Sequence, residues 1–72
     1  MLRYFFHFHS GLVVTPDLEG TEFSSLEAAI AEAQRARTEI MADGAIACRE
    51  YRFEIADQNG RVVATVPFTH DF

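Results

Sequence analysis

Residues 3–9, which read Arg-Tyr-Phe-Phe-His-Phe-His, constrain the fold more than any other part of the chain. This pattern predicts a β-strand, in which successive side chains point to opposite faces. The even-numbered positions of one face are all aromatic, and the other face carries Phe5, His7 and His9. A strand that is apolar on one face needs a single covering layer. This strand is apolar on both faces, so we expect each face to be covered by other residues. We therefore expect a central strand with a helix on one side and a binding surface on the other.

The chain has 72 residues, which predicts one domain spanning residues 1–72. A chain of this length buries only about 60% of the surface that its unfolded form exposes, so such domains often rely on a crosslink or a partner. Cys48 is the single cysteine and cannot form an internal disulfide. We therefore predict a homo-oligomer, with a dimer as its simplest form.

The formal net charge is −5, and all six basic residues are arginines scattered along the chain. Binding to a nucleic-acid backbone requires a basic patch that releases counterions, so the sequence predicts no nucleic-acid partner. The first residues lack the apolar core and cleavage site of a signal peptide, and no segment approaches the roughly 20 apolar residues of a membrane span. These features predict a cytoplasmic protein without a membrane contact.

The first strand, about residues 2–9, is followed by Ser10-Gly11, which predicts a tight turn because glycine accepts a positive φ. Residues 12–16 then form the returning strand, which Pro16 ends because proline cannot donate to the ladder. Counting outward from this turn pairs residue 8 with residue 13 and residue 7 with residue 14.

A polar connection over residues 17–23 precedes the clearest helix signal. Ser24 and Glu27 match a capping box, in which each side chain satisfies an otherwise unpaired backbone N–H. Apolar residues then recur at helical spacing, which predicts an amphipathic helix over about residues 25–43 with Gly44 as its stop.

The last two strands are predicted over residues 51–57 and 61–67, joined by Asn59-Gly60. This dipeptide is typical of a type I′ hairpin turn, which needs a positive φ at both central positions. Counting outward from it pairs residue 55 with residue 64, residue 53 with residue 66 and residue 51 with residue 68, all of them apolar and on one face.

These elements predict an α+β fold of the ββαββ type, a four-stranded sheet with one amphipathic helix on one face. Numbered in chain order, the strands are expected in the order 2-1-4-3, because the first and last strands are apolar on both faces. The helix is expected to pack on Tyr4, Phe6, Phe8, Phe53, Ile55, Ala64 and Val66. The candidate interface is the helix-free face, with Phe5, His7, His9, Leu12, Val14, Val63 and Thr65.

Four short motifs in this order resemble a family of small stand-alone bacterial domains of unknown function. They are Arg-Tyr-Phe-Phe-His at residues 3–7, Asp-x-Glu-Gly-x-Glu at 17–22, Asp-x-x-Gly at 57–60 and Val-Pro-Phe at 66–68. The resemblance covers nearly the whole chain and implies a compact domain without an assigned activity. Residues 16–20 and 25–29 also resemble HicB-type antitoxin domains, but the chain reaches its helix without the additional strand of those domains. We treat this second likeness as one of architecture.

The residues that could carry chemistry do not complete a site. His7 and His9 lie about 7 Å apart on one strand face, and two imidazoles can begin a metal site. Three or four ligands are needed, and the further candidates are His70, Asp71 and Glu54.

Two other features are better explained by structure than by chemistry. The carboxylates of Asp17, Glu19 and Glu22 precede the helix and are expected to favour its positive end. Cys48 lies among small apolar residues, where a packed side chain is expected in place of a nucleophile. No phosphate-binding loop or nucleophile elbow is present, so we predict neither an enzyme nor a cofactor.

The sequence assigns no specific function. The leading hypothesis is a non-enzymatic interaction module that self-associates through the helix-free sheet face, because a monomer would leave that apolar patch in water. One alternative is a small-ligand or metal-binding domain that uses His7 and His9. Another is an antitoxin-like or regulatory partner of a second protein.

Overall fold

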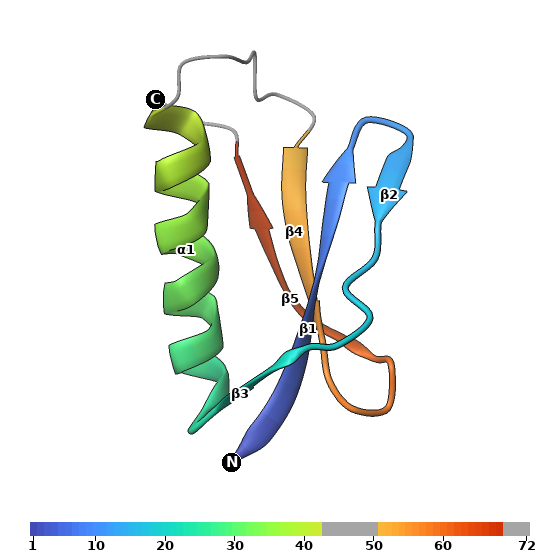
Figure 1. The fold of residues 1–72 in the computed structure, drawn as a ribbon, viewed down its shortest axis with the longest axis vertical. Helices are drawn as coiled ribbons and strands as arrows, with labels where there is room; N and C mark the ends of the chain where they lie inside the picture. The colour runs from blue at the N-terminus through green and yellow to red at the C-terminus, as the bar shows by residue number, and fades with distance from the viewer. Residues whose placement is uncertain (43–50, 69–72) are drawn as a thin grey trace.

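The computed structural model describes residues 1–42 and 51–68, in which an antiparallel sheet is covered by one helix (Figure 1). The elements are β1 (Leu2–Ser10), β2 (Val13–Thr15), β3 (Thr21–Phe23), α1 (Leu26–Ala42), β4 (Tyr51–Ala56) and β5 (Val62–Pro67). The α+β class with a single helix on the sheet is as predicted. The sheet has five strands, not four, because the segment expected to be a polar connection contains β3.

The predicted strand order is wrong as well as the strand number. The observed order is β2-β1-β4-β5, with β3 paired to the first residues of β1. β4 therefore lies beside β1, where the prediction placed the last strand. Along this contact Phe5 pairs with Ala56, and His7 pairs with Glu54.

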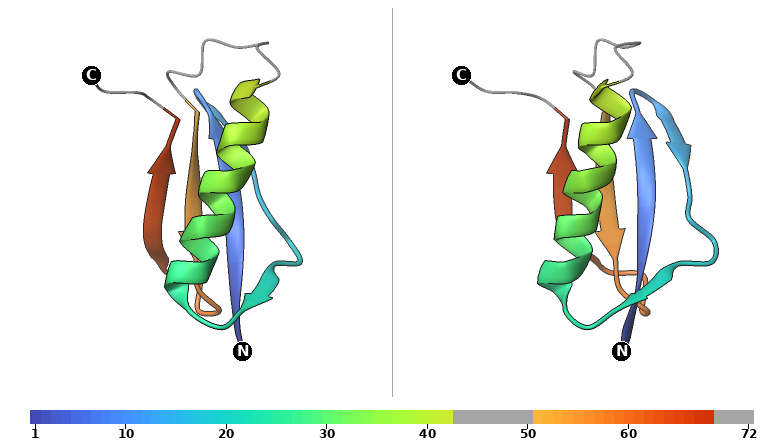
Figure 2. Two further views of the ribbon diagram at one scale, coloured as in Figure 1. Left: turned by 90° about the vertical axis from the view of Figure 1, so that its left-hand side faces the viewer. Right: turned by 60° about the vertical axis from the view of Figure 1, so that its left-hand side comes forward.

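The missed strand explains the order. β3 and β4 both pair antiparallel with β1, so they run parallel to each other on the two sides of it. Parallel strands need a crossover connection, and α1 provides it by passing over one face of the sheet (Figure 2). Since this crossover skips only β1, the strand that follows the helix arrives beside β1.

The first hairpin turns one residue later than predicted. Ser10 pairs with Val13, which leaves Gly11 and Leu12 as the two-residue loop. Gly11 has φ 62°, the glycine conformation required at the first position of a type II′ turn. The pairing is shifted by two residues from the predicted one, so Phe8 faces Thr15, and each side chain keeps its predicted face.

The second hairpin has the predicted register in its centre, where Phe53 pairs with Val66 and Ile55 with Ala64. Its turn is of another type, because Gly60 has φ 81° and no residue other than glycine has a positive φ in the described chain. The Gly60 N–H donates to the Asp57 carbonyl at 3.0 Å, and a bulge between Ile55 and Ala56 absorbs the additional loop residue.

The helix begins one residue later than predicted and has a different cap. The Ala28 N–H donates to Ser25 Oγ at 3.2 Å, so Ser25 is the N-cap and the predicted capping box of Ser24 and Glu27 does not form. The predicted stop at Gly44 lies outside the described residues. Within those residues no helix is long and apolar enough to cross a membrane.

The core lies between α1 and one face of the sheet. Ala29 and Ala33 are fully buried, and these small side chains let the helix approach the strands closely. Opposite them lie Ile55 and an aromatic cluster in which the Phe53 and Phe68 rings are 5.5 Å apart. All seven residues expected under the helix belong to this core or pack against it: Tyr4, Phe6, Phe8, Phe53, Ile55, Ala64 and Val66.

The connection between β2 and β3, residues 16–20, lies close against β1. Gly20 has φ 72°, and a Cβ atom built on it would lie 2.9 Å from both Phe5 Cε2 and the Tyr4 carbonyl oxygen. Only glycine fits this approach, because both the backbone conformation and the available space exclude a side chain.

Gly20→Ala and Gly60→Ala form a matched pair that separates these two requirements. Both positions have a positive φ, but a Cβ at Gly60 would meet nothing within 4 Å. We expect Gly60→Ala to cost about 1 kcal/mol of unfolding free energy from backbone strain alone. Gly20→Ala should cost about 2 kcal/mol more, because the neighbouring backbone must also move. Urea denaturation measures both values, and equal losses would contradict the close packing at Gly20.

Candidate functional site: the helix-free sheet face

Most of the candidate residues lie on the sheet face opposite α1, but they do not form one continuous apolar patch. On β1, Phe5, His7 and His9 are half-buried at the centre of the face. Val14 is 49% exposed and pairs with His9, while Leu12 is fully exposed in the turn.

The two remaining candidates lie on the far side of β4. Thr65 is exposed and pairs with Glu54, which separates it from His7. The prediction for Val63 is wrong: it is the extra residue of the β5 bulge, and its half-buried side chain packs against the core under α1. The observed strand order thus inserts β4 into the predicted patch.

The side chains that β4 brings to this face form a polar network with His9. The His9 ring places Nε2 2.7 Å from Glu54 Oε1, and an Arg52 guanidinium nitrogen lies 3.1 Å from Nδ1. Arginine can only donate, so Nδ1 accepts and Nε2 carries the proton donated to Glu54. Arg52 also lies 3.5 Å from the same carboxylate. The three side chains thus satisfy one another's hydrogen-bonding groups. The positive charge of Arg52 and the negative charge of Glu54 compensate each other on this face.

The sequence analysis did not place Arg52 in this site, and it named Glu54 only as a further candidate metal ligand for His7 and His9. The predicted strand order put the strand that carries both residues at the edge of the sheet. Their spacing of two residues was the available signal, because it puts an arginine and a glutamate side by side. The spacing does not say which strand lies next to them.

His7 is held by the β2–β3 connection. Its Nδ1 accepts the Asp17 backbone N–H at 3.1 Å. The Asp17 carboxylate in turn accepts N–H groups from Phe6, Glu19 and Gly20 at 3.1 to 3.3 Å. Burial raises the pKa of the Asp17 carboxyl, but these three donors and the nearby His7 outweigh it and lower the pKa below 3.8.

The other two acidic residues of this segment also have local partners. The Arg3 guanidinium donates to the Glu19 carbonyl at 2.7 Å and lies 3.6 Å from the Glu22 carboxylate. The helix end, where these carboxylates were expected, is instead capped by Ser25. The motifs at residues 3–7 and 17–22 therefore bind each other along the edge of β1.

The histidines do not assemble a metal centre with other described residues. No group of three or more His, Cys, Asp or Glu side chains suited to a metal ion occurs within residues 1–42 and 51–68. Both His9 nitrogens and His7 Nδ1 already take part in hydrogen bonds. Cys48, His70 and Asp71 lie outside the described residues.

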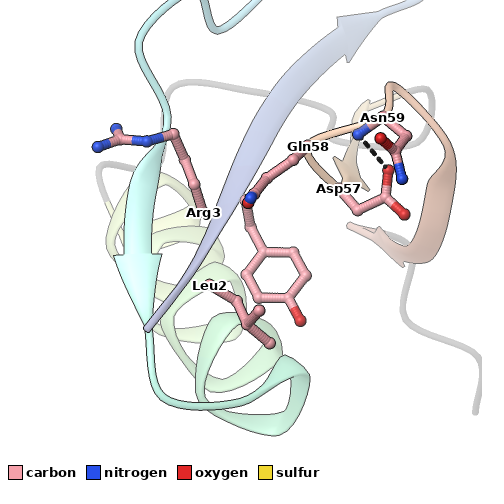
Figure 3. A pocket seen from close by; sticks show the side chains of 6 residues that line it. Leu2, Arg3, Asp57, Gln58 and Asn59 are labelled. Atoms are coloured by element: carbon pink, nitrogen blue, oxygen red, sulfur yellow. Dashed lines mark hydrogen bonds between the residues drawn. The ribbon is translucent and has the colours of Figure 1, made fainter.

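A surface pocket of about 370 Å³ lies between the start of β1 and the β4–β5 turn (Figure 3). Its lining residues are Leu2, Arg3, Tyr4, Asp57, Gln58 and Asn59. One Asp57 carboxylate oxygen accepts N–H groups from Asn59 at 2.9 Å and from Arg61 at 3.0 Å, and the Arg3 guanidinium points away from this turn. Both charged groups of the pocket wall thus already stabilise the fold.

The fold is a small domain in which a helix crosses over one strand of an antiparallel sheet, with an uncovered face that carries a self-compensated polar network. Comparison with family models matches residues 3–69 to DUF6894, a domain of unknown function. The chain belongs to this family, as the four motifs indicated, and the family assigns no specific function. No curated protein and no solved structure matched the chain.

Asp17→Asn should destabilise the domain, with Asp57→Asn as the matched control. Both Asp17 oxygens accept backbone N–H groups, and an amide would turn one of them into a donor. At Asp57 one oxygen accepts both turn N–H groups, and an amide oxygen can replace it. We expect Asp17→Asn to cost about 2 kcal/mol at pH 7 and the control less than about 0.5 kcal/mol.

The Asp17 contribution should also depend on pH. Because the folded-state pKa lies below the ordinary value of 3.8, the stabilisation is complete above that value and is lost as the pH falls through the folded-state pKa. The difference in unfolding free energy between wild type and Asp17→Asn should therefore narrow from pH 5 toward about pH 2. Chemical denaturation across this range measures it, and a constant difference would contradict the assigned role.

Proposed function

We propose that this domain is a non-enzymatic interaction module that self-associates, as a dimer in its simplest form, through the helix-free face of the sheet. The observation that carries the proposal is the polar network of His9, Arg52 and Glu54. Its charges compensate within one molecule, so two copies can bring this face together without opposing like charges.

The exposure of apolar residues supports the same surface. α1 covers one face only, and on the other face Val14 is 49% exposed beside His9, while Phe5 is half-buried further along β1. Such a surface resembles the apolar part of an interface with polar groups that are already satisfied. Burying it would add stability to a domain whose own core is small.

A metal-binding role for His7 and His9 has less support. A metal ion would have to displace the His9 contacts to Glu54 and Arg52, or bind His7 through Nε2 alone. Neither histidine has a third ligand within the described residues.

Val14→Arg tests the proposed face, with Val13→Arg as its control. The two residues are neighbours on β2 with exposed fractions of 49% and 64%, but they point to opposite faces. An arginine at position 14 should weaken association about tenfold or more by burying a charge in the contact, while Val13→Arg should leave it unchanged. Sedimentation equilibrium measures the dissociation constants. A strictly monomeric wild type, or equal effects of the two variants, would refute the proposal.

A further inference from the structure

The outer margin of β5 has properties that differ from those of the helix-free face. β5 is the last strand of the sheet, and within the described chain it pairs with β4 alone (Figure 2). The Phe68 N–H donates to the Tyr51 carbonyl at 2.9 Å, which shows that the backbone at position 68 points toward β4. The backbone N–H and C=O groups of successive strand residues point alternately to the two sides of the strand. Those of Thr65, three residues before Phe68, therefore point away from β4 and from the sheet.

The arginines at the two ends of this strand lack the partners that the other described arginines have. Arg3, Arg35 and Arg52 each lie within 4 Å of a glutamate carboxylate, at 3.6, 2.5 and 3.5 Å. Arg37 and Arg61 form no ion pair within residues 1–42 and 51–68.

Both of these arginines lie at an end of β5, although Arg37 belongs to α1. Arg61 directly precedes the strand, and Arg37 donates to the Pro67 carbonyl at its other end at 3.1 Å. Residues 62–67 between them are uncharged. A strand of six residues spans about 20 Å, so the margin is an uncharged edge between two positive charges.

We propose that the β5 margin binds an extended segment of another protein that has an uncharged centre and acidic residues at both ends. The segment would add to the sheet as a strand, with backbone hydrogen bonds to Thr65 and its carboxylates near Arg37 and Arg61. This proposal goes beyond self-association and does not depend on it.

Charge argues against a second copy of the chain at this margin. Two β5 strands can add symmetrically only in the antiparallel direction, which places the Arg61 end of one copy beside the Arg37 end of the other. Those ends repel, whereas an acidic-ended segment is attracted to both. Proline at position 67 and the bulge near Ala56 shorten the part of the edge that can form backbone hydrogen bonds. With few such bonds available, the charges at the two ends of the edge decide which segment binds.

The test uses two synthetic peptides with the same Thr-Val-Thr-Val-Thr centre, one flanked by Asp-Glu at both ends and one flanked by Lys-Lys. With the acidic peptide, the Thr65 amide signal in nuclear magnetic resonance spectra should shift and its hydrogen exchange should slow. We expect the lysine-flanked peptide to bind at least about tenfold more weakly. Fluorescence anisotropy of the labelled peptides measures the affinities.

Substitutions at Thr65 and Arg61 connect the binding to the proposed geometry. Thr65→Pro removes the outward N–H and leaves the β4 contacts, so it should abolish binding, whereas Thr65→Val keeps the N–H and should bind normally. Arg61→Glu should weaken the acidic peptide about tenfold and leave the fold intact, because Arg61 is exposed.

Three outcomes would overturn the proposal. The first is no binding of the acidic peptide to the wild-type protein, and the second is equal binding of both peptides or of Thr65→Pro. The third is a shift of the Thr65 amide that grows with protein concentration in Val14→Arg without peptide, which would assign the margin to a second copy. Thr65 also lies on the helix-free face, so Val14→Arg on the opposite edge of the sheet separates the two proposals. This variant should lose self-association through the helix-free face and keep peptide binding, so each proposal can fail alone.

Discussion

The arrangement of this domain depends on the carboxylate of Asp17. It accepts three backbone N–H groups, one from β1 and two from the β2–β3 connection, and so fixes that connection against the edge of β1. It thereby supports β3 beside the start of β1, together with the ladder between the two strands and the contact of Arg3 with Glu22. The crossover that places β4 next to β1 begins from this connection, so it relies on one half-buried acceptor.

A turn in which an aspartate accepts backbone N–H groups occurs twice in the chain. In each Asp-x-x-Gly sequence, at residues 17–20 and 57–60, the aspartate accepts the N–H two residues ahead, and the glycine has a positive φ. At Asp17 the second carboxylate oxygen reaches another strand, whereas at Asp57 one oxygen closes a hairpin locally. The family motifs thus consist of residues that form turns and strand contacts. For this reason they identify the family without indicating an activity.

Features determined by residues close together in the chain were predicted correctly from the sequence. Features that depend on which distant segments pair with each other were not. Alternation placed Tyr4 and Phe53 under the helix, and the second hairpin had the right central register because residues close to a turn determine it. Strand order was wrong because β3 has only three residues, two of them polar, and gains its pairing from Asp17. The polar network on the helix-free face was missed for the same reason, since Glu54 meets His9 only after β4 is placed beside β1.

The two proposed surfaces differ in how the fold distributes charge. On the helix-free face, Arg52 and Glu54 compensate each other across a histidine, so a partner with the same net charge of −5 can approach it. At the β5 margin, Arg37 and Arg61 remain without carboxylate partners among the described residues, so a copy of the same strand is disfavoured there and an acidic segment is favoured. One surface uses side chains that point away from α1, and the other uses the backbone of the last strand. Since these groups are separate, occupation of one does not require the other to be vacant.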